Sequence, residues 1–348
     1  MEELPRVDPH EDPYLALRTA LAVALCLLLA EPLGITMPML PAVMGMSIMS
    51  NQRGALNPRV FVTPIALPII GIIFSWVAAV TVNEPMVFTL INIGLAVGGL
   101  ALMLFKGSRG GMMLTVFPLM MAMSALYSDY ALAVMRDSMV MGGVALGVAV
   151  VGLNLLFPPR TKRVHEEVVT PLVSGQARRH LLIRSAVYLP VMLLVFASGD
   201  MNMMIIPIML LFVCAEPRRG TQMNQVVDRG GGTMVGALIA IGVLTVYSMI
   251  PELPVLILLC TVATYFLIDK MTTGKRRPLI YQYTCSAALV MILQATSGGR
   301  DALEVVLQRV VMTGGAMMAA ILALALLEAI FLAPEDDAPA APLAAQAP

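Results

Sequence analysis

Two arginines inside long apolar segments are the side chains best suited to bind a ligand. Arg136 and Arg309 lie in the sixth and twelfth apolar stretches, roughly 8 to 10 Å from where those stretches begin if both are helical. A charge at the bilayer centre costs a few kcal/mol, so such residues usually face the inside of a helix bundle. Two guanidinium groups held together could bind a carboxylate bidentately. We predict that both arginines bind substrate. The alternatives are that each reaches the outer interface or pairs with a neighbouring carboxylate.

Three carboxylates could carry protons. Asp137 and Glu304 lie in the outer part of the stretches that hold the two arginines, and Asp228 lies on the inner side of another stretch. Burial disfavours the charged form of a carboxyl group, which is the property that proton coupling requires. We name these residues as proton-coupling candidates. The structural alternative for each is a salt bridge or a solvated helix end.

The elements that must position these residues are membrane helices. The sequence is 59% hydrophobic and 13% charged, and a soluble chain of 348 residues could not bury that much apolar surface. Twelve apolar stretches are near the length that crosses a bilayer. They run over 15–30, 36–50, 61–80, 86–105, 112–127, 131–157, 181–197, 203–215, 231–250, 255–268, 279–295 and 303–332. The prediction is an all-α polytopic membrane protein with about 12 transmembrane helices. Ten is the alternative, because the second and eighth stretches are short.

The chain also repeats itself. Leu17-Arg18-Thr19-Ala20 returns as Ile183-Arg184-Ser185-Ala186 at an offset of 166 residues, and later matches follow an offset of about 172. Six stretches in each half predict two parallel six-helix repeats, with a substrate path where the halves meet. We interpret Arg18 and Arg184 as topology anchors. The predicted organisation is a cytoplasmic segment 1–14, a first repeat 15–157, a cytoplasmic linker 158–180, a second repeat 181–332 and a disordered acidic tail 333–348.

Loop charges set the predicted orientation. Lys and Arg are retained on the cytoplasmic side, and alternate loops differ sharply in these residues. The basic loops carry Arg53, Arg59, Lys106, Arg109, Arg160, Lys162, Arg163, Arg178, Arg179, Arg218, Arg219, Lys270, Lys275, Arg276 and Arg277. The other turns carry Glu31, Glu84, Asp129, Asp200, Glu252 and Asp301, with Arg300 as their basic residue. Both termini are therefore predicted to be cytoplasmic.

The ninth stretch opens with the most specific local pattern. Gly232, Gly236 and Ala240 are four residues apart, so one helix face is lined with small residues and another helix can approach closely. Arg229 stands beside the predicted helix N-terminus, where free backbone N–H groups could receive an anion. The two interpretations, close helix packing and anion binding, are compatible with each other. The further helix-packing candidates are Thr233, Gly142, Gly143, Gly314 and Gly315.

This pattern carries a family resemblance. Arg-x-x-Gly-Thr-x-x-Gly-Ala-x-x-Ala, at Arg229 to Ala240, resembles the signature of the fusaric acid resistance and aromatic acid exporter superfamily of bacterial inner-membrane proteins. The first half keeps Arg59 and Thr63 of the motif, but Pro64 and Pro68 replace its small residues. The chain looks like a compact branch, without the large cytoplasmic domain of many members. The resemblance implies efflux, and a periplasmic membrane-fusion protein as a partner.

Other classes of function find no support. The sequence has no phosphate-binding loop for ATP, no zinc-hydrolase pattern and no nucleophile elbow, so we predict no enzyme, no cofactor and no metal site. The four cysteines have no metal or disulfide spacing. The 29 methionines could bind Cu(I), but without Cys pairs or His clusters they are better explained as flexible apolar filler. A formal net charge of zero gives no support for nucleic-acid binding.

Together these features predict a proton-coupled efflux transporter in the bacterial inner membrane. Its substrate would be a small amphipathic organic anion, in the first place an aromatic carboxylic acid. The alternative is a non-transporting membrane scaffold or assembly partner of an efflux complex. A cavity lined by Arg136 and Arg309 would favour transport, whereas a dry, packed centre would favour the scaffold. The sequence leaves the oligomeric state open.

Overall fold

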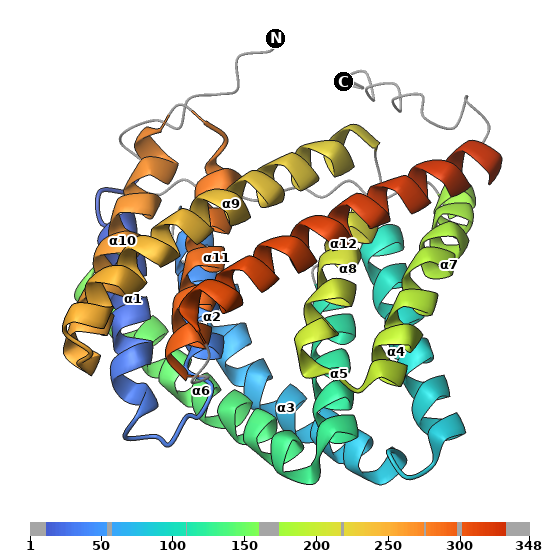
Figure 1. The fold of residues 1–348 in the computed structure, drawn as a ribbon, viewed down its shortest axis with the longest axis horizontal. Coiled ribbons are helices and arrows are strands. Elements are labelled where there is room, and N and C mark those ends of the chain that lie inside the picture. Colours follow the sequence, from blue (N-terminus) through green and yellow to red (C-terminus); the bar gives the residue numbers. More distant parts are fainter. Residues whose placement is uncertain are drawn as a thin grey trace, which may run out of the picture.

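The computed structural model describes residues 12–53, 58–108, 110–159, 174–216, 219–274, 276–297 and 301–331, and these residues form helices and connecting turns (Figure 1). The first half holds α1 (Leu15–Ala30), α2 (Met39–Asn51), the short 3₁₀ helix η1 (Pro58–Phe61), α3 (Val62–Thr81), α4 (Pro85–Lys106), α5 (Gly110–Tyr127) and α6 (Asp129–Leu156). The second half holds α7 (Ser174–Ser198), η2 (Met201–Met204), α8 (Ile205–Ala215), α9 (Arg219–Met249), α10 (Leu253–Thr273), α11 (Pro278–Ser297) and α12 (Ala302–Phe331).

Local signals set several helix ends. The Ser128 hydroxyl accepts a hydrogen bond of 3.0 Å from the Ala131 N–H and so caps α6. Pro85 begins α4, where its missing N–H costs nothing. Gly107 ends the same helix with φ of 60°, a left-handed conformation that favours glycine.

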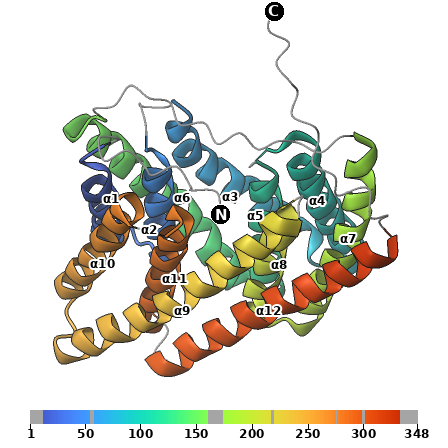
Figure 2. The ribbon, with the colours of Figure 1, turned by 90° about the horizontal axis from the view of Figure 1, so that it is seen from above.

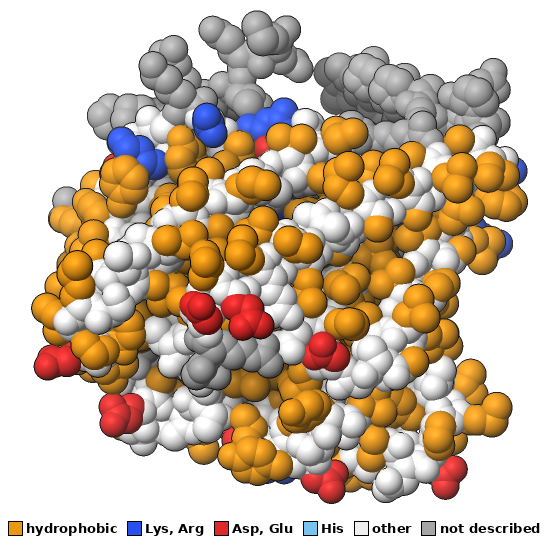
Figure 3. Space-filling model, in the orientation of Figure 1, with side chains coloured by type: hydrophobic (Ala, Val, Ile, Leu, Met, Phe, Trp, Pro, Cys, Tyr) orange, Lys and Arg blue, Asp and Glu red, His pale blue; other side chains and the backbone are white. Residues whose placement is uncertain are grey.

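Nine of the described helices are long and apolar enough to cross a bilayer, which makes the chain a multi-pass membrane protein. The segments that fall short are α1, the η2–α8 segment Met201–Ala215, and α2 with 13 residues. Large apolar side chains such as Trp76, Leu238 and Leu322 point outward and are between 65% and 70% exposed. Apolar side chains cover most of the face in Figure 3, as expected for a surface that meets lipid.

The main packing pairs occur twice. In the first half α3 packs on α5 and α6, α4 on α5, and α1 on α2. In the second half α9 packs on α11 and α12, α10 on α11, and α7 on α8. Between the halves α1 packs on α10 and α4 on α7, while α2 packs on α11 and α5 on α8. Helices α9 and α12 run side by side along one edge (Figure 2).

Methionines from separate parts of the chain meet in one apolar cluster. Met120, Met121, Met135 and Met139 of α5 and α6 are buried there. The partly buried methionines that pack against them are Met37, Met44, Met113, Met201 and Met204. The cluster therefore joins the first half to η2 of the second half. Within the described residues, no group of His, Cys, Asp or Glu side chains could hold a metal ion.

Two helices begin before the apolar stretches that the sequence marks. Helix α9 begins at Arg219, well before the predicted start at residue 231, and α7 begins at Ser174, inside the predicted linker 158–180. The apolar pattern marks only the lipid-facing part of a helix, whereas both helices continue as polar turns beyond it. The tail 333–348, most of the N-terminal segment 1–14 and residues 160–173 of the linker lie outside the described residues.

Candidate functional site

The small-residue face of α9 lies directly against α11. A Cβ atom added to Gly232 would come within 3.0 Å of the Tyr283 Cβ, and one added to Gly236 within 2.8 Å of the Thr284 carbonyl oxygen. Ala240, one turn further along, is fully buried. The two backbones can approach this closely because no side chain stands between them. This contact fixes the position of the polar end of α9.

Arg229 lies ten residues inside α9, so it does not stand beside the N-terminus of that helix, as the sequence had predicted. Its backbone is part of the helix, and its guanidinium group lies 3.5 Å from the ring centre of Phe212 and 4.1 Å from that of Tyr283. The two rings belong to α8 and α11 and interact favourably with the cation. The Nε atom is buried and has no hydrogen-bond partner among the described residues.

Acidic and amide side chains lie on the same part of α9 or contact it. Asp228 is 5% exposed and forms an ion pair of 3.6 Å with Arg277, which is itself 40% exposed. The Glu216 carboxylate accepts a hydrogen bond of 2.6 Å from Gln225, and its backbone carbonyl accepts one of 2.9 Å from Gln222. Asp228 is therefore a buried carboxylate that is paired with an arginine. This geometry corresponds to the salt bridge that the sequence analysis gave as the alternative to proton coupling.

Arg309 is held between α12 and α11. Its Nε donates a hydrogen bond of 2.7 Å to the Gln294 Oε1, and the side chain is half-buried. A neutral amide leaves the charge of the guanidinium uncompensated at this contact. Arg309 can therefore still attract an anion.

Arg136 has a different environment. Its Nε lies 2.8 Å from the Asp137 Oδ1, and the two side chains are 45% and 59% exposed. This is the predicted alternative of pairing with a neighbouring carboxylate. Helix α6 packs on α1, α2, α3 and α5, whereas α12 packs on α7, α8, α9 and α11. The structure thus gives Arg136 and Arg309 separate partners and does not bring them together.

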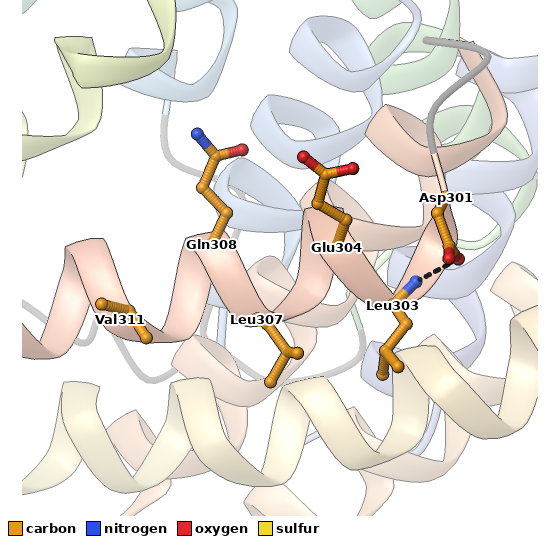
Figure 4. A pocket seen from close by; sticks show the side chains of 6 residues that line it. All are labelled: Asp301, Leu303, Glu304, Leu307, Gln308 and Val311. Atoms are coloured by element: carbon orange, nitrogen blue, oxygen red, sulfur yellow. Dashed lines mark hydrogen bonds between the residues drawn. The ribbon is translucent and has the colours of Figure 1, made fainter.

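Glu304 lines an open groove along the start of α12 (Figure 4). The groove has a volume of about 600 Å³ and is lined by Asp301, Leu303, Glu304, Leu307, Gln308 and Val311. Glu304 and Gln308 point to one side of the helix, while Leu303 and Leu307 point to the other. The Asp301 carboxylate accepts a hydrogen bond of 3.1 Å from the Leu303 N–H. Glu304 is exposed, which corresponds to the solvated alternative.

The two glycine pairs differ in their surroundings. A Cβ on Gly143 would come within 2.5 Å of the Pro68 ring, and one on Gly142 within 3.4 Å of Pro41. A Cβ on Gly314 or Gly315 would meet no described atom within 4 Å. The packing predicted for the second pair is therefore not found. The repeat in sequence has kept the glycines, but α6 packs closely on α3 at this point while α12 leaves its glycines open.

Two arginines lie in environments that differ from the predicted ones. Arg18 and Arg184 are both fully buried, so neither is a topology anchor that reaches the lipid surface. Arg18 lies 2.5 Å from Asp12 and also donates to the Asn154 side chain at 3.5 Å. Arg184 donates to the Cys214 carbonyl oxygen at 2.7 Å. The sequence repeat could have indicated that these arginines are buried. A charged residue that recurs at matching positions in both halves is expected to have a structural role inside the bundle.

A comparison with known families matches residues 190–323 to the family described as fusaric acid resistance protein-like. These residues run from the middle of α7 into α12 and contain the whole Arg229–Ala240 motif. Searches of curated proteins and of solved structures gave no match. The second half of the chain is therefore similar to the fusaric acid resistance protein-like family, and the Arg229–Ala240 motif lies inside the matched residues.

Proposed function

We propose that the chain is a secondary transporter of the bacterial inner membrane that exports small amphipathic organic anions, in the first place aromatic carboxylic acids, in exchange for protons. The observation that carries this proposal is the family match over residues 190–323 in an all-helical, multi-pass chain. Transport of the fusaric acid resistance type is what that family implies. The family match does not give the substrate class or the coupling to protons, and both are part of this proposal.

The twofold packing scheme supports a transporter built from two parallel six-helix repeats. Contacts between the halves come in matched pairs, α1 on α10 with α7 on α4, and α2 on α11 with α8 on α5. Such a scheme is expected if a pseudo-twofold axis runs along the membrane normal, as in transporters whose halves rock against each other. Lys and Arg side chains gather at one end of the face in Figure 3, and Asp and Glu mostly toward the other. This separation favours a cytoplasmic position for both termini.

Two of the predicted arginines support a path for a carboxylate along α11. Arg229 contacts Tyr283 of this helix, and Arg309 contacts Gln294 nearer its other end. Each presents guanidinium N–H groups that could bind a carboxylate. We place substrate contact at these two residues. The partly buried methionines where the halves meet would suit the apolar ring of such a substrate. Arg136, the third predicted substrate-binding arginine, is paired with Asp137.

The second candidate function is a membrane scaffold or assembly partner of an efflux complex. One observation favours it: neither the α12 groove nor the small cavity next to Asn92 is lined by Arg136 or Arg309. The small cavity, about 10 Å³, is too small for an aromatic acid. A periplasmic membrane-fusion protein docked on the acidic turns would fit either function.

Export measurements distinguish the two functions. Cells expressing the wild type, Arg229→Ala or Arg309→Ala at equal membrane levels are loaded with a labelled hydroxybenzoate panel, with and without a protonophore. Transport predicts protonophore-sensitive export that falls in both variants and persists in Arg178→Ala, which removes an exposed arginine of α7. If the wild type moves no acid above an empty-vector control, the aromatic-acid proposal fails and the scaffold is favoured.

A further inference from the structure

Helix α2 of the first half and α11 of the second half lie side by side and share a polar contact (Figure 2). The Nε2 atom of Gln282, in α11, donates hydrogen bonds of 3.1 Å to the Ser50 Oγ and of 3.4 Å to the Asn51 Oδ1. Both acceptors belong to the end of α2. Ser50 is fully buried and Gln282 is 7% exposed, whereas Asn51 is exposed. We refer to these three residues as the Gln282 contact, and it lies where the interface between the halves meets the surface.

The Gln282 contact is at the end of the molecule that is predicted to face the cytoplasm. Asn51 precedes one of the basic loops, and Gln282 shortly follows the basic turn that ends at Arg277. Tyr283, the next residue of α11, lies against Arg229 at 4.1 Å. In the proposed function a carboxylate moves along α11 and contacts Arg229 at its inner end. The Gln282 contact is therefore beside the inner start of that path.

Each of the two helices is held closely by its own half. A Cβ added to Gly45 of α2 would lie 3.3 Å from the Cys26 Sγ in α1 and 3.4 Å from the Leu146 side chain in α6. Beyond the end of α2, the Arg18 guanidinium group donates a hydrogen bond of 3.4 Å to the Gln52 carbonyl oxygen. Helix α11 in turn packs against the small-residue face of α9. Because both helices are fixed within their halves, a movement of one half against the other must act on the contact between them.

A hydrogen bond between neutral side chains suits a contact that opens and closes. When such a bond breaks in the presence of water, water replaces each partner, so the net cost is small. Ser50 also keeps a partner in its own helix, because its hydroxyl donates to the Ser47 carbonyl oxygen at 3.2 Å. Separating an apolar contact instead exposes surface that water does not bind favourably.

The matching contact between the halves, α5 on α8, is apolar in its place. Residues 110–116 correspond to Gln282 at offsets from 172 to 166, and none of them has an amide or a charge in its side chain. Val116 packs against the buried methionines of the apolar cluster. Met37 and Met201, which pack there too, lie beside turns that are predicted to face outward. The polar contact is thus the one that can open to water at the inner end.

We propose that the Gln282 contact is the inner gate of the transporter. Its hydrogen bonds break when the halves part toward the cytoplasm and form again when the halves close, so that substrate reaches Arg229 while the gate is open. The gating role rests on the proposed function, because a gate has a task only in a protein that moves a substrate. The opening itself can be measured without any substrate.

Thiol labelling measures the opening in the purified, full-length protein in lipid nanodiscs, where a water-soluble maleimide reaches both faces. The four native cysteines are buried. Ser124→Cys in α5 is the matched control for Ser50→Cys, because Ser124 is also fully buried and bonds within its own helix. We expect Ser50→Cys to be modified over time and Ser124→Cys to stay unmodified. Equal reactivity of the two variants, at a low or a high level, would overturn the gate.

A cross-link tests whether transport needs this opening. Ser50→Cys combined with Gln282→Cys is joined in cell membranes by a short bis-methanethiosulfonate reagent, and mass spectrometry of the digested protein measures the cross-linked fraction. The control is Thr36→Cys with Ser138→Cys, whose native hydroxyl oxygens lie 3.2 Å apart within the first half. We expect export of labelled 4-hydroxybenzoate to be lost in the cross-linked Ser50–Gln282 pair, to return on reduction, and to persist in the control pair.

The outcomes separate the gate from the proposed function. If the wild type exports the probe and the cross-linked pair exports it equally, the gate fails while the proposed function stands. If the wild type exports no probe, the proposed function fails, and the labelling of Ser50→Cys still decides whether the contact opens. If the double variant does not fold, Asn51→Cys with Gln282→Cys replaces it, because Asn51 is exposed at the same contact. A pair that never cross-links would contradict the contact itself.

Discussion

At the scale of single residues, position in the sequence located the charges but not their environments. The positive-inside pattern correctly draws attention to Arg18 and Arg184 near helix starts, yet it cannot tell whether a side chain reaches the lipid headgroups or turns into the bundle. Burial decides this, and burial depends on neighbours that are far apart in sequence. Arg18 and Asn154, for example, are 136 residues apart. Arg136 shows the opposite case, since its partner is the next residue and could be named from the sequence.

This difference in environment predicts unequal costs for removing the two arginines. Arg18→Ala leaves the buried Asp12 carboxylate without its cation and should lower the free energy of unfolding by about 3–5 kcal/mol. Arg136→Ala breaks an exposed pair and should cost no more than about 1 kcal/mol. Thermal denaturation of both variants in the same detergent provides the comparison. Equal melting temperatures would contradict the burial of Arg18.

At the scale of the helices, the sequence predicted twelve elements, and their apolar parts lie where expected. Apolar runs are reliable here because a helix in lipid must be apolar over its whole crossing. Their polar extensions were missed, since residues such as Arg219 to Asp228 carry no membrane signal. The predicted apolar stretch begins at residue 231, within the glycine triplet Gly230–Gly232. In the structure its last glycine packs on α11, and the helix continues through it.

The contact between α9 and α11 yields a prediction with an internal control. Gly236→Ala places a methyl group 2.8 Å from the Thr284 carbonyl oxygen, so the helices must separate at a cost of about 1–3 kcal/mol. Gly242→Ala changes the same helix where no atom lies within 4 Å. It should be neutral or stabilise by up to about 1 kcal/mol, because alanine favours the helix. Denaturation midpoints that fall equally in both variants would show that close packing is not the cause.

At the scale of the whole molecule, the duplication in sequence predicts which helices of the two halves correspond, but not how closely each corresponding pair packs. The offset of 166 residues predicts which helices correspond, and α1–α10 with α7–α4 follows that correspondence. It does not predict where the halves diverge. Gly143 packs on Pro68 of α3, whereas Gly315 faces open space, and α9, the counterpart of α3, has no proline. The divergent places are where one half can acquire a task that the other lacks.

The orientation of the molecule, and whether α2 crosses the membrane, can be tested together. The four native cysteines are buried, so an introduced surface cysteine can be labelled with little background. Asn83, in the turn between α3 and α4, and Thr273, at the end of α10, are both exposed. With both termini inside and α2 crossing, a membrane-impermeant maleimide should label Asn83→Cys in intact spheroplasts, and Thr273→Cys only after permeabilisation. If α2 turned back instead, α3 would run the other way and Asn83→Cys would be protected. Protection of both sites would therefore favour the ten-span alternative. Labelling of Thr273→Cys alone would show that the orientation is the reverse of the predicted one.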